Sequence, residues 1–378
     1  MVMILKLKGL SLKLLLKGFF ITFFLFVNSQ EKINTHYQNS GKLKEVFYGF
    51  INKDDTIKNG LYKIYYENDS LWQIGEFNNG LLSGFWRDYY PNGKIKQLLY
   101  FEKGVLRDST VSYYPNGNIY QVNNYQNDTL NGVSKTYFEG GKLKFENLYS
   151  DGKKEGEQKS YFKNGHVKEV FFSSQGSKNG TFQGYYKEKE GGLQKNCFYI
   201  NDLLNGNFFG YYESGNLMNQ SNYINDTISG KYYEFFDSTQ KLVSNFGHYT
   251  KGKREGKWIW YYQNEKIYIS GDFVNDKKNG DWQVFYSDEK IKQRGGYSDG
   301  KEVGLWEFFD VNGYYSFKGH YLNGLKNGQW TSYYPNRKIK VIQFYKKGLK
   351  EGMAFFYDEE GGLIEKAIFK NDSIYQNN

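Results

Sequence analysis

The sequence predicts an all-β fold: an elongated, twisted antiparallel sheet of about thirteen stacked hairpins, each 24 residues long. Aromatic residues, which favour strands, make up 20% of the chain. The chain has 43 glycines and only 3 prolines, so turn residues are frequent and few positions lose a ladder hydrogen bond. The third observation is self-similarity at a fixed period, and it decides the architecture.

The first 29 residues have the layout of a secretory signal peptide. Four lysines with no acidic residue accompany an apolar run at residues 18–27, and Val27 and Ser29 suit cleavage before Gln30. The run is shorter than the roughly 20 apolar residues that a membrane-spanning helix needs. We therefore expect an exported protein, in the periplasm, on the outer-membrane surface or outside the cell. An uncleaved N-terminal anchor is the alternative.

Net charge and cysteine content narrow the possible partners and bonds. Loss of the four lysines lowers the net charge from +9 to +5, a mild excess that does not indicate a nucleic-acid partner. Cys197 is the only cysteine, so the chain forms no internal disulfide and depends on packing and backbone pairing. A single cysteine of this kind is typically a small, buried apolar residue.

A glycine opens each copy of the repeat, and we number it position 0. Successive copies are 24 residues apart, except for two steps of 26 whose extra residues fall near 190–192 and 238–240. A degenerate half-copy at residues 30–59 precedes thirteen copies at residues 60–378. The opening residues are Gly60, Gly84, Asp108, Gly132, Gly156, Gly180, Gly206, Gly230, Gly256, Gly280, Gly304, Gly328 and Gly352.

Positions 0 to +6 of a copy predict a strand with aromatic residues on both faces. Position +5 is Tyr or Phe in all thirteen copies, and position +6 is aromatic in eleven. Because side chains alternate along a strand, positions +2, +4 and +6 share one face and position +5 lies on the other. Position +2 is Trp in five copies, whereas Thr110, Ser134 and Gln158 replace it in the middle copies, where we expect the least regular ladder.

Two turns and a second strand complete each copy. Pro91, Pro115 and Pro335 all occupy position +7, and Asn-Gly or Gly-Gly recurs at +8 and +9, which predicts a hairpin loop built on a type I turn. The second strand carries an aliphatic residue at +11 and an aromatic at +17 in most copies. An isolated hairpin is marginal in water, so neighbouring copies must stack edge to edge. No long helix is expected after residue 30, because no sustained apolar period of 3.6 occurs there.

The unit Gly-x-Trp-x-x-Tyr-Tyr-x-Asn-Gly, clearest at residues 84–93 and 328–336, resembles the MORN repeat. It is most similar to the bacterial variant in YwqK-type proteins, which are often labelled antitoxin components. The resemblance covers about residues 60–378. It implies a groove-forming β-sheet that contacts proteins and, in some members, phospholipid membranes. The repeat is specific for fold and says little about function.

Motifs for catalysis and metal binding are missing from the sequence. It contains no nucleophile elbow, phosphate-binding loop or His-Glu-x-x-His motif. His248 and His320 occupy the same repeat position three copies apart, so stacking separates them by roughly 29 Å, too far to share a metal ion. Loops such as Asn127-Asp128 offer one carboxylate, whereas calcium needs six or more oxygens. We expect no enzyme, no metal and no cofactor.

A Lys-aliphatic-Lys pattern at positions +10 to +12 is a candidate for binding anions or lipids. The two lysines of a pair share a face, so adjacent copies could form an interrupted basic row that favours anionic headgroups or an acidic partner. The alternative is a solvated strand surface on which lysine discourages edge aggregation. The candidates are Lys94, Lys96, Lys142, Lys144, Lys290, Lys292, Lys338 and Lys340.

The aromatic ladder is the second candidate surface. Aromatic residues on both faces of a single-layer sheet cannot all be covered by a core, and Tyr and Trp dominate interface hot spots. Alternatively, coiling of the sheet covers one ladder and solvates the tyrosine hydroxyls of the other. The candidate partner-binding residues are Trp258, Tyr261, Trp282, Phe285, Trp306, Trp330 and Tyr333.

Together these patterns favour an exported, non-enzymatic repeat protein that acts as a protein-binding or scaffolding surface. One alternative is an antitoxin- or immunity-like role. A cytosolic antitoxin needs no signal peptide, so this role requires a toxin that is met in the periplasm. The other alternative is binding to an anionic membrane surface.

Overall fold

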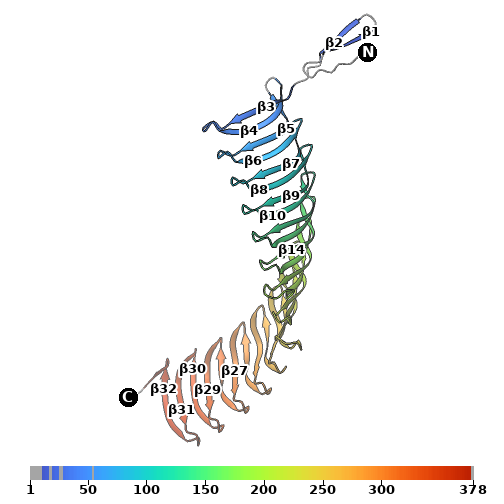
Figure 1. Cartoon of the computed structure of the whole chain (residues 1–378). Coiled ribbons are helices and arrows are strands. Elements are labelled where there is room, and N and C mark those ends of the chain that lie inside the picture. Colours follow the sequence, from blue (N-terminus) through green and yellow to red (C-terminus); the bar gives the residue numbers. More distant parts are fainter. Residues whose placement is uncertain (1–10, 17–18, 25–28, 53–54, 376–378) are drawn as a thin grey trace. The chain divides into compact units, whose positions relative to one another are not determined.

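The computed structural model describes residues 11–16, 19–24, 29–52 and 55–375. Every regular element among these residues is a β-strand, so the predicted all-β class is confirmed (Figure 1). Within the same ranges, no helix is long and apolar enough to cross a membrane.

The predicted signal segment is only partly described. Its strands β1 (Ser11–Leu16) and β2 (Phe19–Phe24) pair as an antiparallel hairpin. Three of its four lysines, and the Val27 position of the predicted cleavage site, lie outside the described residues. Export and cleavage therefore stay predictions.

The chain divides into two compact units, one of residues 1–166 with 174–176 and one of residues 167–173 with 177–378. Successive strands pair antiparallel within each unit, and each repeat copy contributes one hairpin. The predicted antiparallel stack of hairpins is therefore confirmed.

After β1 and β2, the first unit contains β3 (Glu31–His36), β4 (Leu43–Asn52), β5 (Asp55–Tyr65), β6 (Leu71–Asn78), β7 (Leu81–Tyr89), β8 (Ile95–Glu102), β9 (Val105–Tyr113), β10 (Ile119–Gln126), β11 (Thr129–Leu130), β12 (Gly132–Tyr137), β13 (Leu143–Ser150) and β14 (Lys153–Tyr161). The second contains β15 (Val167–Ser174), β16 (Ser177–Tyr185), β17 (Leu193–Ile200), β18 (Leu203–Tyr211), β19 (Leu217–Ile224), β20 (Thr227–Ile228), β21 (Gly230–Phe235), β22 (Val243–Thr250), β23 (Lys253–Tyr261), β24 (Ile267–Val274), β25 (Lys277–Phe285), β26 (Ile291–Ser298), β27 (Lys301–Phe309), β28 (Tyr315–Leu322), β29 (Leu325–Tyr333), β30 (Ile339–Lys346), β31 (Leu349–Tyr357), β32 (Leu363–Lys370) and β33 (Ser373–Ile374).

The first strand of a copy begins earlier than the sequence pattern predicted. β25 starts three residues before Gly280 and ends at position +5, whereas a strand from 0 to +6 was expected. Position +6 belongs to the turn, where the N–H of Tyr286 donates to the carbonyl of Lys290 at 2.8 Å. The strand passes through position 0 because a β-bulge lies there. Pairing of β25 with β24 skips from Gln283 to Asn279 at this point.

The bulge explains why glycine opens each copy. All twelve position-0 glycines have positive φ, between 65° at Gly256 and 122° at Gly180. Asp108, the single replacement, has φ of 58°. Glycine adopts this left-handed conformation without steric cost, whereas other residues lose free energy in it.

Replacing Asp108 with glycine should raise the free energy of unfolding by about 0.5 to 1 kcal/mol, because it removes the left-handed strain. Asp108→Ala should act in the opposite direction, since alanine tolerates positive φ less well than aspartate. Thermal melts of the wild type, Asp108→Gly and Asp108→Ala check the predicted order of their stabilities. A stabilising Asp108→Ala would contradict it.

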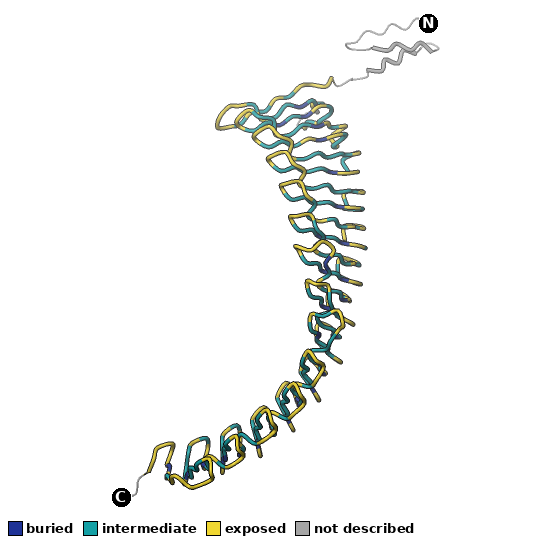
Figure 2. Tube along the Cα trace, turned by 60° about the horizontal axis from the view of Figure 1, so that its bottom comes forward, coloured by how far each residue is buried: buried dark blue, intermediate teal, exposed yellow. Residues whose placement is uncertain are grey.

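The core of each unit is a row of position +2 side chains within a single sheet. Trp86 is 2% exposed and Trp306 is 4% exposed. Thr110, Ser134 and Gln158 are also buried at this position, and the antiparallel pairing continues through their copies, with a break at Asn131 between β11 and β12. A like break at Ser229, between β20 and β21, lies outside these copies, so the middle copies are not distinctly less regular than the others. Figure 2 shows exposed residues gathered at the turns and less exposed residues along the strands.

Candidate binding surface

Each tryptophan at position +2 packs on a glycine at position +15 of the preceding copy. A Cβ atom added to Gly295 would fall well within 3.0 Å of the Cδ2 and Cε2 atoms of Trp306. The missing side chain at position +15 therefore makes the space that the indole fills. The five pairs are Gly75–Trp86, Gly247–Trp258, Gly271–Trp282, Gly295–Trp306 and Gly319–Trp330.

The indole N–H of most of these tryptophans donates to a backbone carbonyl of the preceding copy. The Nε1 atom of Trp282 lies 3.1 Å from the carbonyl oxygen of Asp272, and the Nε1 atom of Trp330 lies 3.0 Å from that of His320. Gln158 reproduces this bond in a copy without tryptophan, because its Nε2 donates to the carbonyl of Leu148 at 3.0 Å. A buried donor needs such a partner, so Gln158 is a polar substitute for the indole.

Positions +15 and +2 vary together along the chain. Where position +2 is Thr110 or Ser134, the preceding position +15 is Leu99 or Asn123 rather than glycine. Our reading of the sequence missed this pairing. The signal that reveals it is the glycine 11 residues before each of the five tryptophans.

Aromatic side chains at position +17 stand edge-on against the tryptophans. The ring centroids of Tyr297 and Trp306 are 5.2 Å apart at 89°, and those of Tyr321 and Trp330 are 5.0 Å apart at 83°. Edge-to-face pairs contribute about 0.5 to 1.5 kcal/mol beyond burial. The aromatic ladder therefore stabilises the packing between neighbouring copies.

Cations at position −2 lie over three of these five tryptophans on the same face, whereas Glu302 holds this position beside Trp306 and Leu82 beside Trp86. The Nζ atom of Lys278 lies 4.4 Å from the ring centroid of Trp282, and that of Lys326 lies 4.3 Å from Trp330. Burial lowers the pKa of both amines. We call the surface of residues 254–357 that carries Trp258, Trp282, Trp306 and Trp330 together with Arg254, Lys278, Lys326 and Lys350 the tryptophan face.

Ionisation of Tyr297 links the aromatic ladder to alkaline pH. Burial, followed by the nearby Glu302 carboxylate, raises the pKa of Tyr297 to about 12. The neutral phenol is thus favoured in the folded state, and its contribution to stability is present below the unfolded pKa of about 10 and lost as the pH rises toward 12. We expect phenolate absorbance to titrate in two groups, with the later group accompanied by unfolding. A single titration near pH 10 without unfolding would contradict this. Tyr297→Phe should remove one phenol from the later group.

The seven predicted partner-binding residues do not lie together on one exposed surface. The four tryptophans are 3% to 5% exposed and form the floor of the tryptophan face. Tyr261, Phe285 and Tyr333, at position +5, alternate to the opposite face and are half-buried; the ring of Tyr333 lies 5.8 Å from that of Tyr315 there. The seven residues are therefore divided between two faces, and their role in partner contact stays a prediction.

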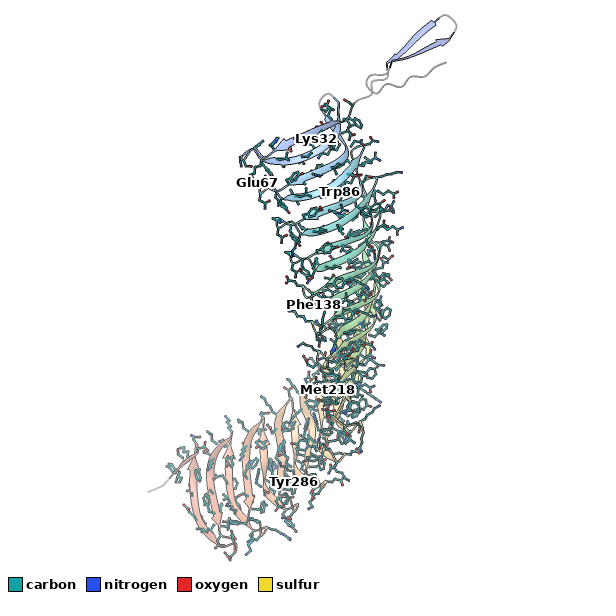
Figure 3. All side chains as sticks on the ribbon, viewed as in Figure 1. Lys32, Glu67, Trp86, Phe138, Met218 and Tyr286 are labelled. Carbon is teal, nitrogen blue, oxygen red and sulfur yellow. The ribbon has the colours of Figure 1, made fainter. Side chains whose placement is uncertain are left out.

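Tyrosines at position +6 join neighbouring copies instead of facing solvent. The hydroxyl of Tyr286 donates to the carbonyl of Phe309, at position +5 of the next copy, at 2.9 Å. Tyr90 makes the same bond to Tyr113 at 2.7 Å. Trp86 and Tyr286, both labelled in Figure 3, represent the core and the connecting aromatic positions.

The predicted lysine row has a different role at each of its two positions. The +10 amines reach the turn of the next copy, as where Lys94 Nζ donates to the carbonyl of Asn116 at 2.7 Å and Lys142 Nζ to that of Asn164 at 2.6 Å. Lys290 and Lys338 make equivalent bonds. At position +12, Lys144, Lys292 and Lys340 lie over the position +6 ring of their own copy, and Lys96 is exposed.

Metal-binding and nucleophilic groups add little to this surface. Among the described residues, no group of three or more His, Cys, Asp or Glu side chains could hold a metal ion. Cys197 is 4% exposed, as predicted, and burial raises the pKa of its thiol.

The profile described as MORN repeat variant matches nine segments that together cover about half of the chain. The chain belongs to this family. The MORN segments are residues 58–79, 84–103, 110–127, 130–151, 154–173, 204–225, 254–275, 326–347 and 350–371. MORN copies opening at Gly180, Gly230, Gly280 and Gly304 lie outside them but form the same hairpins. MORN repeats are commonly protein- or membrane-binding modules, generally without enzymatic activity.

No curated protein matches the chain. Among solved structures, a crystal structure of TcdB2-TccC3-Cdc42 is 10% identical over 89% of this chain and 23% of that one, with a TM-score of 0.15. A crystal structure of the eukaryotic initiation factor is 10% identical over 93% of this chain and 90% of that one, with a TM-score of 0.20. The MORN chain thus spans about a quarter of the first of these chains. Likenesses this low do not inform its fold or function.

Proposed function

We propose that the chain is an exported, non-enzymatic binding module that holds a protein partner on the tryptophan face. The observation that carries the proposal is the row of cations over aromatic rings in residues 254–357. The Cζ atom of Arg254 lies 4.0 Å from the ring centroid of Phe273, and the amines of Lys278 and Lys326 lie in the same way over Trp282 and Trp330. The buried tryptophans act as the floor, while the cation heads and ring edges are the groups that meet a partner.

Position −2 carries four cations and one carboxylate, Glu302, across residues 254–357, and this positive excess favours a partner with an acidic surface. Complementary charges steer association and select among partners. Aromatic residues beside the cations supply the apolar contact area that interface hot spots require. An antitoxin-like role would be one form of the same binding, with a toxin as the acidic partner. An anionic membrane is less favoured, because the +10 amines of the lysine row bond to backbone carbonyls.

Co-purification from the native envelope tests the proposal. The full chain with its own N-terminus is compared with the Arg254→Glu, Lys278→Glu double variant, and Lys178→Glu serves as the matched control. Lys178 also occupies position −2 over aromatic rings, 5.3 Å from Phe182, but lies outside residues 254–357. We expect one partner whose recovery falls with the double variant and with added salt, but not with the control. Equal recovery with all three proteins would contradict the proposed face, and retention of the chain in the cytoplasm would contradict export.

A further inference from the structure

A hollow of about 400 Å³ opens on the tryptophan face where the row of indoles ends. Its walls include the rings of Trp330, Tyr345 and Phe356, its rim carries Lys326 and Lys350, and Gln343 provides an amide. Volumes of this size are typical of sites that hold a small ligand or a few side chains.

The hollow exists because the repeat changes at this point. Trp330 is the last tryptophan at position +2, and the next copy has Ala354 there, which is fully buried opposite Gln343. Alanine lacks the ring that would continue the row. The rings of Trp330 and Phe356 therefore border the same unfilled space.

Positive charge predominates among the residues that line the hollow. None of the residues that line it is acidic. Lys326 Nζ lies 4.3 Å from the ring centroid of Trp330, and Lys350 Nζ lies 5.0 Å from that of Phe369. Asp372 lies nearby, but its Oδ1 accepts the backbone N–H of Lys350 at 2.7 Å. Two amines thus share one apolar hollow, and an anion placed between them gains two charge-assisted contacts.

We propose that this hollow is an anchor for an acidic side chain next to an aromatic side chain on the protein partner. The carboxylate accepts hydrogen bonds from Lys326 and Lys350, while the aromatic ring packs against Trp330, Tyr345 and Phe356. The proposal rests on the proposed function, because it treats the occupant as part of a protein. It adds the chemistry of the segment that the tryptophan face recognises.

Two capped peptides test the anchor on the full chain. Acetyl-Gly-Glu-Phe-Gly-amide carries the proposed pair, and acetyl-Gly-Gln-Phe-Gly-amide is identical except for the charge. We expect the acidic peptide to bind at least about tenfold more tightly, the size expected for charge-assisted bonds, and the difference to shrink in salt. Chemical-shift or fluorescence titration measures both. Equal binding of the two peptides would overturn the proposal.

Substitutions locate the binding. Lys326→Met and Lys350→Met keep much of the apolar stem and should each weaken the acidic peptide about fivefold or more. Lys178→Met is the matched control, because Lys178 lies over rings at the same repeat position but outside the tryptophan face, and it should leave binding unchanged. Melting curves show that each variant is folded. An equal loss with Lys178→Met would place the peptide elsewhere and reject the hollow.

The two proposals fail separately. If the acidic peptide binds at Lys326 and Lys350 while no partner is recovered from the envelope, the anchor stands and the proposed function falls. If a partner is recovered through Arg254 and Lys278 but the peptides bind equally, the function stands and the anchor falls. Binding of free phenylpropionate with no binding of either peptide would also reject a protein segment as the occupant.

Discussion

Replacing Gly295 with alanine is expected to lower the free energy of unfolding by about 3 kcal/mol, the upper end of the usual cost of overpacking. The added Cβ would lie well within 3.0 Å of the Cδ2 and Cε2 atoms of Trp306, which belong to the rigid indole ring. The ring cannot retreat easily, because Tyr297 and Phe308 lie 5.2 Å and 6.0 Å from it. Amide hydrogen exchange of β26, β27 and β28 measures the loss locally, which suits a repeat array that does not unfold as one unit.

Two controls separate the clash from a general effect of removing glycine. A Cβ at Gly140 would meet nothing within 4 Å, and this residue lacks positive φ, so Gly140→Ala should change stability by less than about 0.5 kcal/mol. In a Trp306→Thr background, Gly295→Ala should cost far less than in the wild type, since the clashing ring is gone. A cost that is independent of Trp306 would show that the two residues are not coupled.

The repeat period was enough to predict most of the fold. Glycine at position 0 marks the bulge in twelve of the thirteen copies, and proline at position +7 marks the turn in three, so the number and the order of the hairpins could be read from spacing alone. The turn prediction holds in detail at Tyr90, whose carbonyl accepts the N–H of Gly93 at 2.8 Å. Local backbone requirements of this kind leave a clear trace in a sequence because few residues meet them.

The candidate surface could not be read in the same way. The alternation of side chains along a strand assigned Trp282 and Phe285 to opposite faces correctly. It gave no information on how deeply each side chain is buried, so buried tryptophans were chosen as contact residues. Burial of Trp282 depends on Gly271 of the preceding copy, which is a relation between two positions. The structural contacts of the lysine row were hidden for a similar reason, because the amine of Lys94 donates to the carbonyl of Asn116 in the next copy; anion binding by this row stays a prediction.

Trp282→Ala is expected to lower the free energy of unfolding by about 4 kcal/mol, within the range for removing a buried aromatic side chain. The indole is 5% exposed, and its Nε1 donates to the carbonyl of Asp272. Its removal leaves a cavity that Gly271 has no side chain to fill. Hydrogen exchange should accelerate in β24, β25 and β26, because stability in a stacked array depends on nearest neighbours.

Trp72 provides the matched control within the same chain. It is 40% exposed at position +12 and stacks on Tyr66 with a centroid distance of 5.5 Å, so Trp72→Ala should cost less than about 1 kcal/mol. Equal losses for the two variants would mean that tryptophan stabilises the array wherever it occurs. A large loss for Trp282 alone would mean that the position +2 row is the core. The cation row of the tryptophan face would then stand on that core, and binding there could be changed through Lys278 or Lys326 without unfolding the copy beneath.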